Sequence, residues 1–378
     1  MLYAVCQFNK NKKLTYVIGV EYYPRHWTNI ALKDFVKMHR QQHRDSLELS
    51  YHDISECHIT YSSAQELLSR LSSLNINEDI DFINSAEWIG NQLRKSLPVQ
   101  AVKSIEDFAQ NNSEAALIIR GLPLGGLIPP TPYDGFTENK NLVLANALHI
   151  GIYHLAGYSP IAYKNENNGK LFRHVVPAKQ GKGQKSSHGS DLTFGFHVDN
   201  PDLPLSPEPI VDKSACPELL SLMAIRSDLK VKSSIVILDN VLANLNRAVI
   251  QTLCTDEYMV ERPASFDIGQ SSRLPILTYD ENNIPYCRYD KENISPLTPK
   301  AAAALLMLEA ELEKQTNQIT TVFCPGDMLL IKNQRTLHRR EAYQARNDGS
   351  DRWLIRLFGA QSLDRIIPVN TFSHIGQD

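Results

Sequence analysis

The sequence contains no long hydrophobic run. No stretch of about 18 apolar residues occurs, which is the shortest run expected of a membrane-spanning helix. Residues 1–10 also lack the basic segment followed by an apolar segment that marks a secretory signal peptide. We therefore expect a cytoplasmic protein that has no membrane partner.

Paired cysteines and an excess of charge of one sign are absent as well. The six cysteines are far apart and form no Cys-x-x-Cys pair, so we expect no zinc site and free thiols in a reducing compartment. Lys and Arg number 39 against 42 Asp and Glu, and the sequence pI is about 6.5. This balance differs from the basic surface of nucleic-acid-binding proteins, so we expect no nucleic-acid partner.

The pattern of apolar residues divides the chain at about residue 98. In the first part, residues 63–71 place four apolar side chains on one helical face, and residues 82–97 predict a further helix. Ser63 and Glu66 have the spacing of a capping box. We expect residues 1–98 to form a helical extension packed on a domain that covers residues 99–378.

The second part consists mainly of short apolar segments that end at Gly or Pro. Such segments predict strands at 116–120, 171–176, 192–198, 234–238, 320–323, 328–332 and 353–358, and helical periodicity occurs at 141–156 and 299–315. This pattern is typical of a mainly β fold with helical decoration (α+β), built on a barrel or jelly roll. Residues 177–190 are rich in Gly, Lys and Ser and suggest a mobile loop, which we hypothesise to be a lid.

Three side chains could hold one metal ion. His197 and Asp199 are separated by one residue, so on a strand both point to the same face. By itself this pair is a weak signal in a chain with 12 histidines. His338 follows the turn at 325–327 and the strand at 328–332, and it could supply the third ligand. Two imidazoles and one carboxylate leave open positions on Fe(II) for an oxidant and a co-substrate.

Two arginines near the end of the chain strengthen this interpretation. Arg352 and Arg356 are four residues apart on a predicted strand, so both face the same side. Arginine binds carboxylates with two parallel hydrogen bonds and is always charged. One of the two could hold a carboxylate co-substrate, and the other could hold the carboxylate of an amino acid.

Together these residues resemble the clavaminate-synthase-like branch of the Fe(II)/2-oxoglutarate oxygenases, which includes hydroxylases of free asparagine, arginine and lysine. The resemblance covers about residues 99–358. Its ordered motifs are Ile118 to Pro123, Gly169 to Pro177, Ser187 to Ser190, Pro217 to Arg226, Pro325 to Asp327, Asn333, His338 to Arg340 and Asp351 to Arg356. Many members of this branch have Glu as the acidic metal ligand, whereas this chain has Asp199.

The resemblance implies a fold and a set of cofactors. The fold would be a double-stranded β-helix, a jelly roll of the cupin type. The cofactors would be Fe(II), with 2-oxoglutarate and O₂ as co-substrates. Arg352 would anchor 2-oxoglutarate, together with Ser233 or Ser234. Because Asp199 keeps the carboxylate that related halogenases lack, the resemblance implies hydroxylation of an sp³ carbon and not halogenation.

The substrate follows from the same resemblance. Arg356 would bind the substrate α-carboxylate, and Glu166 and Asp290 occupy positions that contact substrate in relatives. Their negative charge favours a basic amino acid, L-lysine first and arginine or ornithine next. Two alternatives remain open: a residue bound to a peptide or a carrier protein, and a binding protein with a decayed metal site. The sequence also leaves open whether the chain forms a homo-oligomer.

Overall fold

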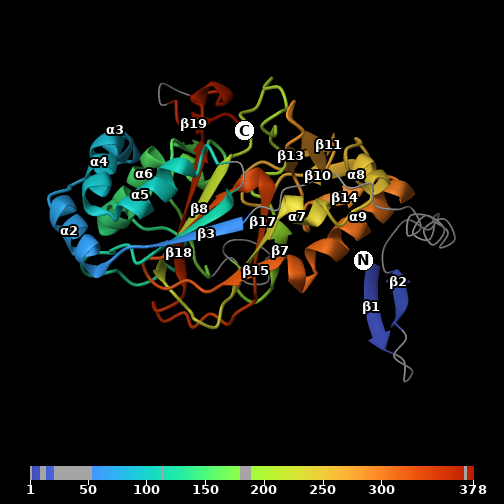
Figure 1. Cartoon of the computed structure of the whole chain (residues 1–378), viewed down its shortest axis with the longest axis horizontal. Helices are drawn as coiled ribbons and strands as arrows, with labels where there is room; N and C mark the ends of the chain where they lie inside the picture. The colour runs from blue at the N-terminus through green and yellow to red at the C-terminus, as the bar shows by residue number, and fades with distance from the viewer. Residues whose placement is uncertain (1, 9–13, 21–52, 112–113, 179–188, 370–372) are drawn as a thin grey trace.

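The computed structural model describes residues 2–8, 14–20, 53–111, 114–178, 189–369 and 373–378. Two β-sheets form its centre (Figure 1). The larger has eight strands in the order β19-β5-β18-β8-β16-β4-β3, and β6 also pairs with β18. Its strands are β3 (Asp53–His58), β4 (Glu114–Arg120), β5 (Ser159–Tyr163), β6 (Arg173–Val175), β8 (Leu219–Arg226), β16 (Met328–Lys332), β18 (Trp353–Ala360) and β19 (Ile375–Gly376).

The smaller sheet has four strands in the order β15-β9-β17-β7. These are β7 (Phe194–His197), β9 (Ser233–Ile237), β15 (Gln318–Thr321) and β17 (Thr336–Arg340). Side chains from both sheets meet in one buried cluster, to which β8, β16 and β18 contribute Leu220, Leu329 and Leu354, and β9 contributes Ile235. The two sheets therefore face one another across a common interior. The prediction of a strand-rich fold with helical decoration is confirmed.

Helices cover the outer face of the larger sheet (Figure 1). They are α2 (Tyr61–Leu71), α3 (Asp79–Asn84), α4 (Ala86–Ser96), α5 (Val99–Asp107) and α6 (Val143–Leu155). Strand β18 shows the consequence of this layering. Trp353, Ile355 and Leu357 belong to the cluster beneath the helices, whereas Leu354 and Phe358 belong to the interior cluster. This alternation places Arg356 on the interior face.

A third group of elements lies between β9 and β15. It contains α7 (Leu238–Leu242), α8 (Arg247–Leu253), α9 (Pro299–Leu312) and five short strands, β10 (Tyr258–Glu261), β11 (Ser271–Leu274), β12 (Leu277–Tyr279), β13 (Pro285–Cys287) and β14 (Ile294–Pro296). The helices and the strands other than β11 contribute to a second hydrophobic cluster, which also includes Phe196 on β7 and Leu337 on β17. The group therefore supports β7 and β17 from outside.

The sequence had suggested a helical N-terminal part, but the structure also contains strands there. Strands β1 (Leu2–Phe8) and β2 (Leu14–Val20) pair with each other, and β3 runs parallel to β4 in the larger sheet. The predicted capping box was also wrong. Helix α2 begins two residues earlier than expected, because Thr60 is the cap and its hydroxyl accepts the backbone N–H of Ser63.

Several other expectations can be compared with the described residues. In that part of the chain no helix has the length and apolar character needed to cross a bilayer. Cys57, Cys216, Cys254, Cys287 and Cys324 are free thiols, as predicted. Most of the loop predicted at 177–190 lies outside the described residues, since the structure describes nothing between 178 and 189.

Candidate metal centre and substrate pocket

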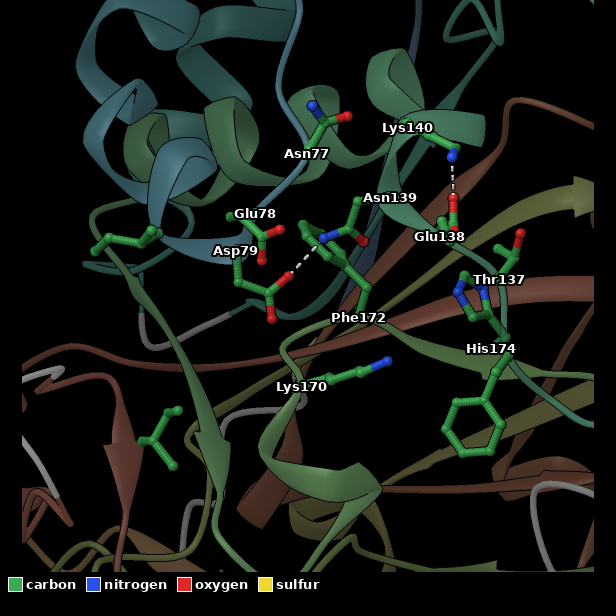
Figure 2. A pocket seen from close by; sticks show the side chains of 13 residues that line it. Asn77, Glu78, Asp79, Thr137, Glu138, Asn139, Lys140, Lys170, Phe172 and His174 are labelled. Carbon is green, nitrogen blue, oxygen red and sulfur yellow. Dashed lines mark hydrogen bonds and ion pairs between the residues drawn. The ribbon is translucent and has the colours of Figure 1, made fainter.

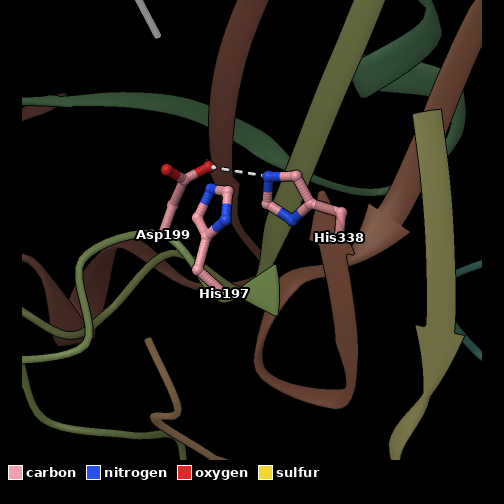
Figure 3. A group of neighbouring side chains, drawn as sticks. All are labelled: His197, Asp199 and His338. Atoms are coloured by element: carbon pink, nitrogen blue, oxygen red, sulfur yellow. Dashed lines mark ion pairs between the residues drawn. The ribbon is translucent and has the colours of Figure 1, made fainter. Parts of the chain in front are cut away.

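The register of the smaller sheet creates a metal-binding geometry. His338 on β17 is the direct cross-strand partner of His197 on β7, and their ring centroids are 4.2 Å apart. Asp199 follows β7 and turns its carboxylate toward both rings (Figure 3). One ligand atom from each of these residues lies within 4.8 Å of the others. The structure thus brings together the three residues that the sequence singled out.

The protonation state of this group suits a divalent cation. The Nδ1 atom of His197 lies 2.8 Å from the carbonyl oxygen of Gly195, which leaves Nε2 free to bind a metal. Burial, helped by the nearby His197 and Arg356, holds the pKa of His338 well below its usual value, so this imidazole is neutral. Asp199 Oδ2 is buried and accepts no hydrogen bond from the described residues. The neutral imidazole of His338, the free Nε2 of His197 and an unsatisfied carboxylate oxygen fit Fe(II).

Asn333 fixes the backbone of Asp199. Its Oδ1 accepts the N–H of Asp199 at 2.9 Å, and its Nδ2 donates to the carbonyl oxygens of Asp199 and Pro217 at 3.0 and 3.1 Å. Asn333 is completely buried. The sequence motif included this residue but did not reveal its task, because the two segments are distant along the chain.

Arg352 lies in the interior next to Ser233. Its guanidinium donates to the Ser233 hydroxyl at 3.3 Å and is within hydrogen-bonding reach of Tyr343. Burial lowers the pKa of Arg352 to about 10, and none of the described carboxylates forms an ion pair with it. A buried guanidinium beside two hydroxyl groups is a suitable binding site for the distal carboxylate of 2-oxoglutarate.

Ser234 does not share this environment. It follows Ser233 on β9, so its side chain points to the opposite face, where its hydroxyl lies 3.3 Å from that of Thr320. Of the two serines that the resemblance proposed, only Ser233 reaches Arg352. The register of β9 against β17, which pairs Ser233 with Arg340, determines this difference.

Arg356 links the metal residues to the expected substrate residues. Its Nη1 is 3.2 Å from Asp199 Oδ1, and its Nη2 is 2.5 Å from Glu166 Oε1. Asn200, next to Asp199, donates from Nδ2 to Glu166 Oε2 at 3.0 Å. Asn200 has a φ of 57°, a left-handed conformation that Asn adopts more readily than most residues. The structure therefore places Arg356 and Glu166 together at the metal site.

Asp290 lies beside the metal residues but is already engaged. It forms an isolated β-bridge with His197, and its carboxylate accepts the N–H of Glu292 at 2.9 Å and the amide of Asn293 at 2.6 Å. Burial raises its pKa. Since each carboxylate oxygen can accept a further hydrogen bond, Asp290 could still contact a substrate.

Arg173 was missed as a site residue. It lies on β6 opposite Arg356, and its Nη1 is 3.9 Å from Glu166 Oε1. The neighbouring His174 points the other way and accepts a hydrogen bond from the Trp353 indole at 3.1 Å. His174 is buried. Because side chains alternate along a strand, Arg173 and His174 point to opposite faces of β6. Only the pairing of β6 with β18 shows that Arg173 is on the interior face.

A separate hollow of about 900 Å³ lies on the helix side of the larger sheet (Figure 2). Its lining includes Asp79 from α3, Asn139 and Lys170, with Asn139 donating to Asp79 at 2.7 Å. Phe172 and His174, the outward neighbours of Arg173, also line it. Its described lining contains none of the metal-site residues, so we do not assign the chemistry to it.

Comparison with known proteins identifies the family. Residues 238–358 match the family model described as taurine catabolism dioxygenase TauD, TfdA family. The chain is 26% identical over 290 residues to an L-asparagine oxygenase of Streptomyces coelicolor, covering 75% of this chain and 83% of that protein. It is 25% identical over 322 residues to an L-lysine 3-hydroxylase of Catenulispora acidiphila, covering 81% and 84%. The chain therefore contains a domain of the TauD/TfdA family and is similar over most of its length to Fe(II)/2-oxoglutarate-dependent oxygenases.

Structural similarity agrees with this assignment at the level of the fold. An asparagine oxygenase solved with Fe(II), a 3-hydroxyasparagine and succinate matches with a TM-score of 0.72, 24% identity, and coverage of 85% of this chain and 99% of that chain. The iron oxygenase OrfP, solved with Fe and α-ketoglutaric acid, matches with a TM-score of 0.70, 22% identity and the same coverage. This oxygenase is an oxidoreductase that depends on Fe(II), 2-oxoglutarate and O₂.

Proposed function

We propose that this oxygenase hydroxylates an sp³ carbon of a free L-amino acid. The single observation that carries the proposal is the adjacency of three features in one interior: the His197–Asp199–His338 group, Arg352 with Ser233, and the Arg356–Glu166 pair. They correspond to a metal, a dicarboxylate co-substrate and an amino acid. On this proposal, the two facing sheets are the double-stranded β-helix that the sequence suggested.

The metal residues would hold Fe(II) through His197 Nε2, His338 Nε2 and an oxygen of Asp199. With O₂ and 2-oxoglutarate, the bound iron supplies oxidation of a C–H bond, and the products are the hydroxylated substrate, succinate and CO₂. The protein's own task is to place that bond and to exclude water. Asn333 supports this placement because it fixes the backbone of Asp199.

Arg356 and Glu166 form an ion pair whose two charges are opposite to the carboxylate and ammonium charges of a free amino acid. An α-carboxylate can replace Glu166 on Arg356, and the released Glu166 can then accept the α-ammonium group. Asn200 keeps the Glu166 carboxylate in position by its hydrogen bond at 3.0 Å. Because both interactions join opposite charges in a buried site, they give orientation as well as affinity.

We further propose a basic side chain, with L-lysine as the first candidate and arginine and ornithine next. Support comes from Asp290, whose carboxyl group is buried beside His197 and can pair with a cationic end. The similarity to an L-lysine 3-hydroxylase points in the same direction. Asp199 retains a carboxylate at the metal, which favours hydroxylation over halogenation.

The test is incubation of the purified protein with Fe(II), 2-oxoglutarate, O₂ and each of the common L-amino acids and ornithine, followed by mass spectrometry. We expect one oxygen atom to be added to a basic amino acid together with an equal amount of succinate. H338A should form no product. Oxygen addition to neutral or acidic amino acids alone would refute the basic preference. Succinate release without any oxygenated amino acid would refute the proposed function.

A further inference from the structure

Arg173 places a second guanidinium in the substrate pocket. The antiparallel register of β6 and β18 makes Arg173 the direct partner of Arg356. Directly opposed residues of a sheet project on the same face, about 5 Å apart at their Cβ atoms. Both side chains are only 7% exposed. Two buried guanidinium groups therefore lie next to each other beside the metal residues.

The charges around these two arginines change when a metal is present. In the structure, Arg356 is shared between Glu166 and Asp199, and Arg173 is 3.9 Å from the same oxygen of Glu166. When Asp199 serves a metal, Arg356 loses one of its two carboxylate partners. Burial and the adjacent Arg356 lower the pKa of Arg173 to about 10. A buried guanidinium that loses a carboxylate partner is stabilised by an arriving anion.

We propose that Arg173 and Arg356 together bind the α-carboxylate of the substrate. Each guanidinium has a rigid fork of donors, so two of them can saturate the oxygens of one carboxylate. Glu166 is then left to the α-ammonium group. This inference rests on the proposed function and narrows it: the substrate must carry an ionised carboxylate. A residue bound to a carrier protein through a thioester lacks that charge and offers no carboxylate to either guanidinium group.

The experiment compares acids with their neutral counterparts. The wild-type enzyme and R173Q are assayed with L-lysine, L-arginine and L-asparagine, each against its α-carboxamide and its pantetheine thioester. We expect the wild type to prefer the free acid, and R173Q to lose about 10- to 100-fold of that preference in kcat/KM. The KM for 2-oxoglutarate should not change. R173K, which keeps the charge but loses the fork, should lie between the two.

The comparison separates binding from a merely structural role. If Arg173 only supports the fold, R173Q lowers kcat/KM for the acid and the amide by the same factor, which would overturn the inference. Equal use of acid and thioester by the wild type would also overturn it. R94Q, which breaks the exposed Arg94–Glu106 ion pair outside the pocket, should leave the preference unchanged.

A second readout keeps this inference distinct from the proposed function. Thermal shifts of the metal-loaded, oxygen-free protein measure binding of each acid and amide without turnover. We expect each acid to stabilise the wild type more than its amide does, and this difference to be lost in R173Q. That result would support carboxylate binding by both arginines even if no hydroxylation occurs. Equal stabilisation by acid and amide, or none by any of the acids, would overturn it.

Discussion

At the residue scale, the face of the strand on which a side chain lies decides its role. Ser233 and Ser234 are neighbours on β9, but only Ser233 contacts Arg352. We expect S233A to raise the KM for 2-oxoglutarate severalfold, because a hydrogen-bond donor beside the carboxylate is lost. S234A is the matched control and should leave that KM unchanged. Equal effects of the two substitutions on this KM would contradict the assignment of Ser233.

Asn333 provides a second prediction at this scale. The N333A substitution removes four side-chain hydrogen bonds, two of which fix the backbone of Asp199. Residues that orient metal ligands typically change metal affinity by about 10- to 100-fold. We expect a loss of that size in an anaerobic titration with Fe(II). N244A, which changes an exposed amide just beyond α7 that donates to the carbonyl oxygen of Asn240, should bind as the wild type does. Unchanged affinity in N333A would show that Asp199 needs no such support.

The sequence revealed those site residues whose geometry is local. His197 and Asp199 share a face because strands alternate, and Arg352 and Arg356 share one for the same reason. The roles of Arg173 and Ser233 depended on long-range registers, β6 against β18 and β9 against β17. No local spacing contains that information.

At the element scale, the turn between β15 and β16 carries a strict backbone requirement. Gly326 has a φ of 87°, and a Cβ there would lie 2.2 Å from the carbonyl oxygen of Leu122. We expect G326A to lower the free energy of unfolding by about 2 kcal/mol or more. Gly269 has no atom within 4 Å of such a Cβ, so G269A should change stability little. Chemical denaturation measures both, and a stable G326A would refute the steric argument.

Elements with a strong pattern were predictable, and short ones were not. The strand predicted at 328–332 is β16 with the same bounds, and the apolar band after Pro299 is α9. Strands β10 to β14 were missed because they have three or four residues each and no clear alternation; β11 is largely exposed along its length. Strands β10, β12, β13 and β14 share a hydrophobic cluster with α8 and α9, and no local sequence pattern shows these long-range contacts.

At the scale of the whole molecule, the helical layer and the larger sheet share one hydrophobic core. Its members extend from Cys57 on β3 to Leu357 on β18. The described helices on both sides of residue 98 belong to this one cluster. The division of the chain into a helical extension and a domain at residue 98 remains a prediction. Because the helices and the larger sheet share this core, each layer contributes to the free energy of unfolding of the other.

Acid should weaken this shared core through His149. The residue is fully buried on α6 against Phe172, and burial lowers its pKa from 6.5 to about 3. The unfolded chain therefore binds a proton below pH 6.5 that the folded chain excludes. This group costs stability as pH falls, by roughly 1.4 kcal/mol per pH unit between those values. H149L should show a shallower decline in denaturation experiments from pH 6.5 to 4.5. Parallel curves for wild type and H149L would contradict this explanation.

The central claim is that His197, Asp199 and His338 form one iron site. The most direct test is anaerobic titration of metal-free protein with Fe(II), followed by determination of the bound iron. The account predicts one Fe(II) per chain in the wild type, loss of this binding in H197A and H338A, and normal binding in H154A, whose histidine is exposed on α6. Full binding of iron by H197A and H338A would contradict it.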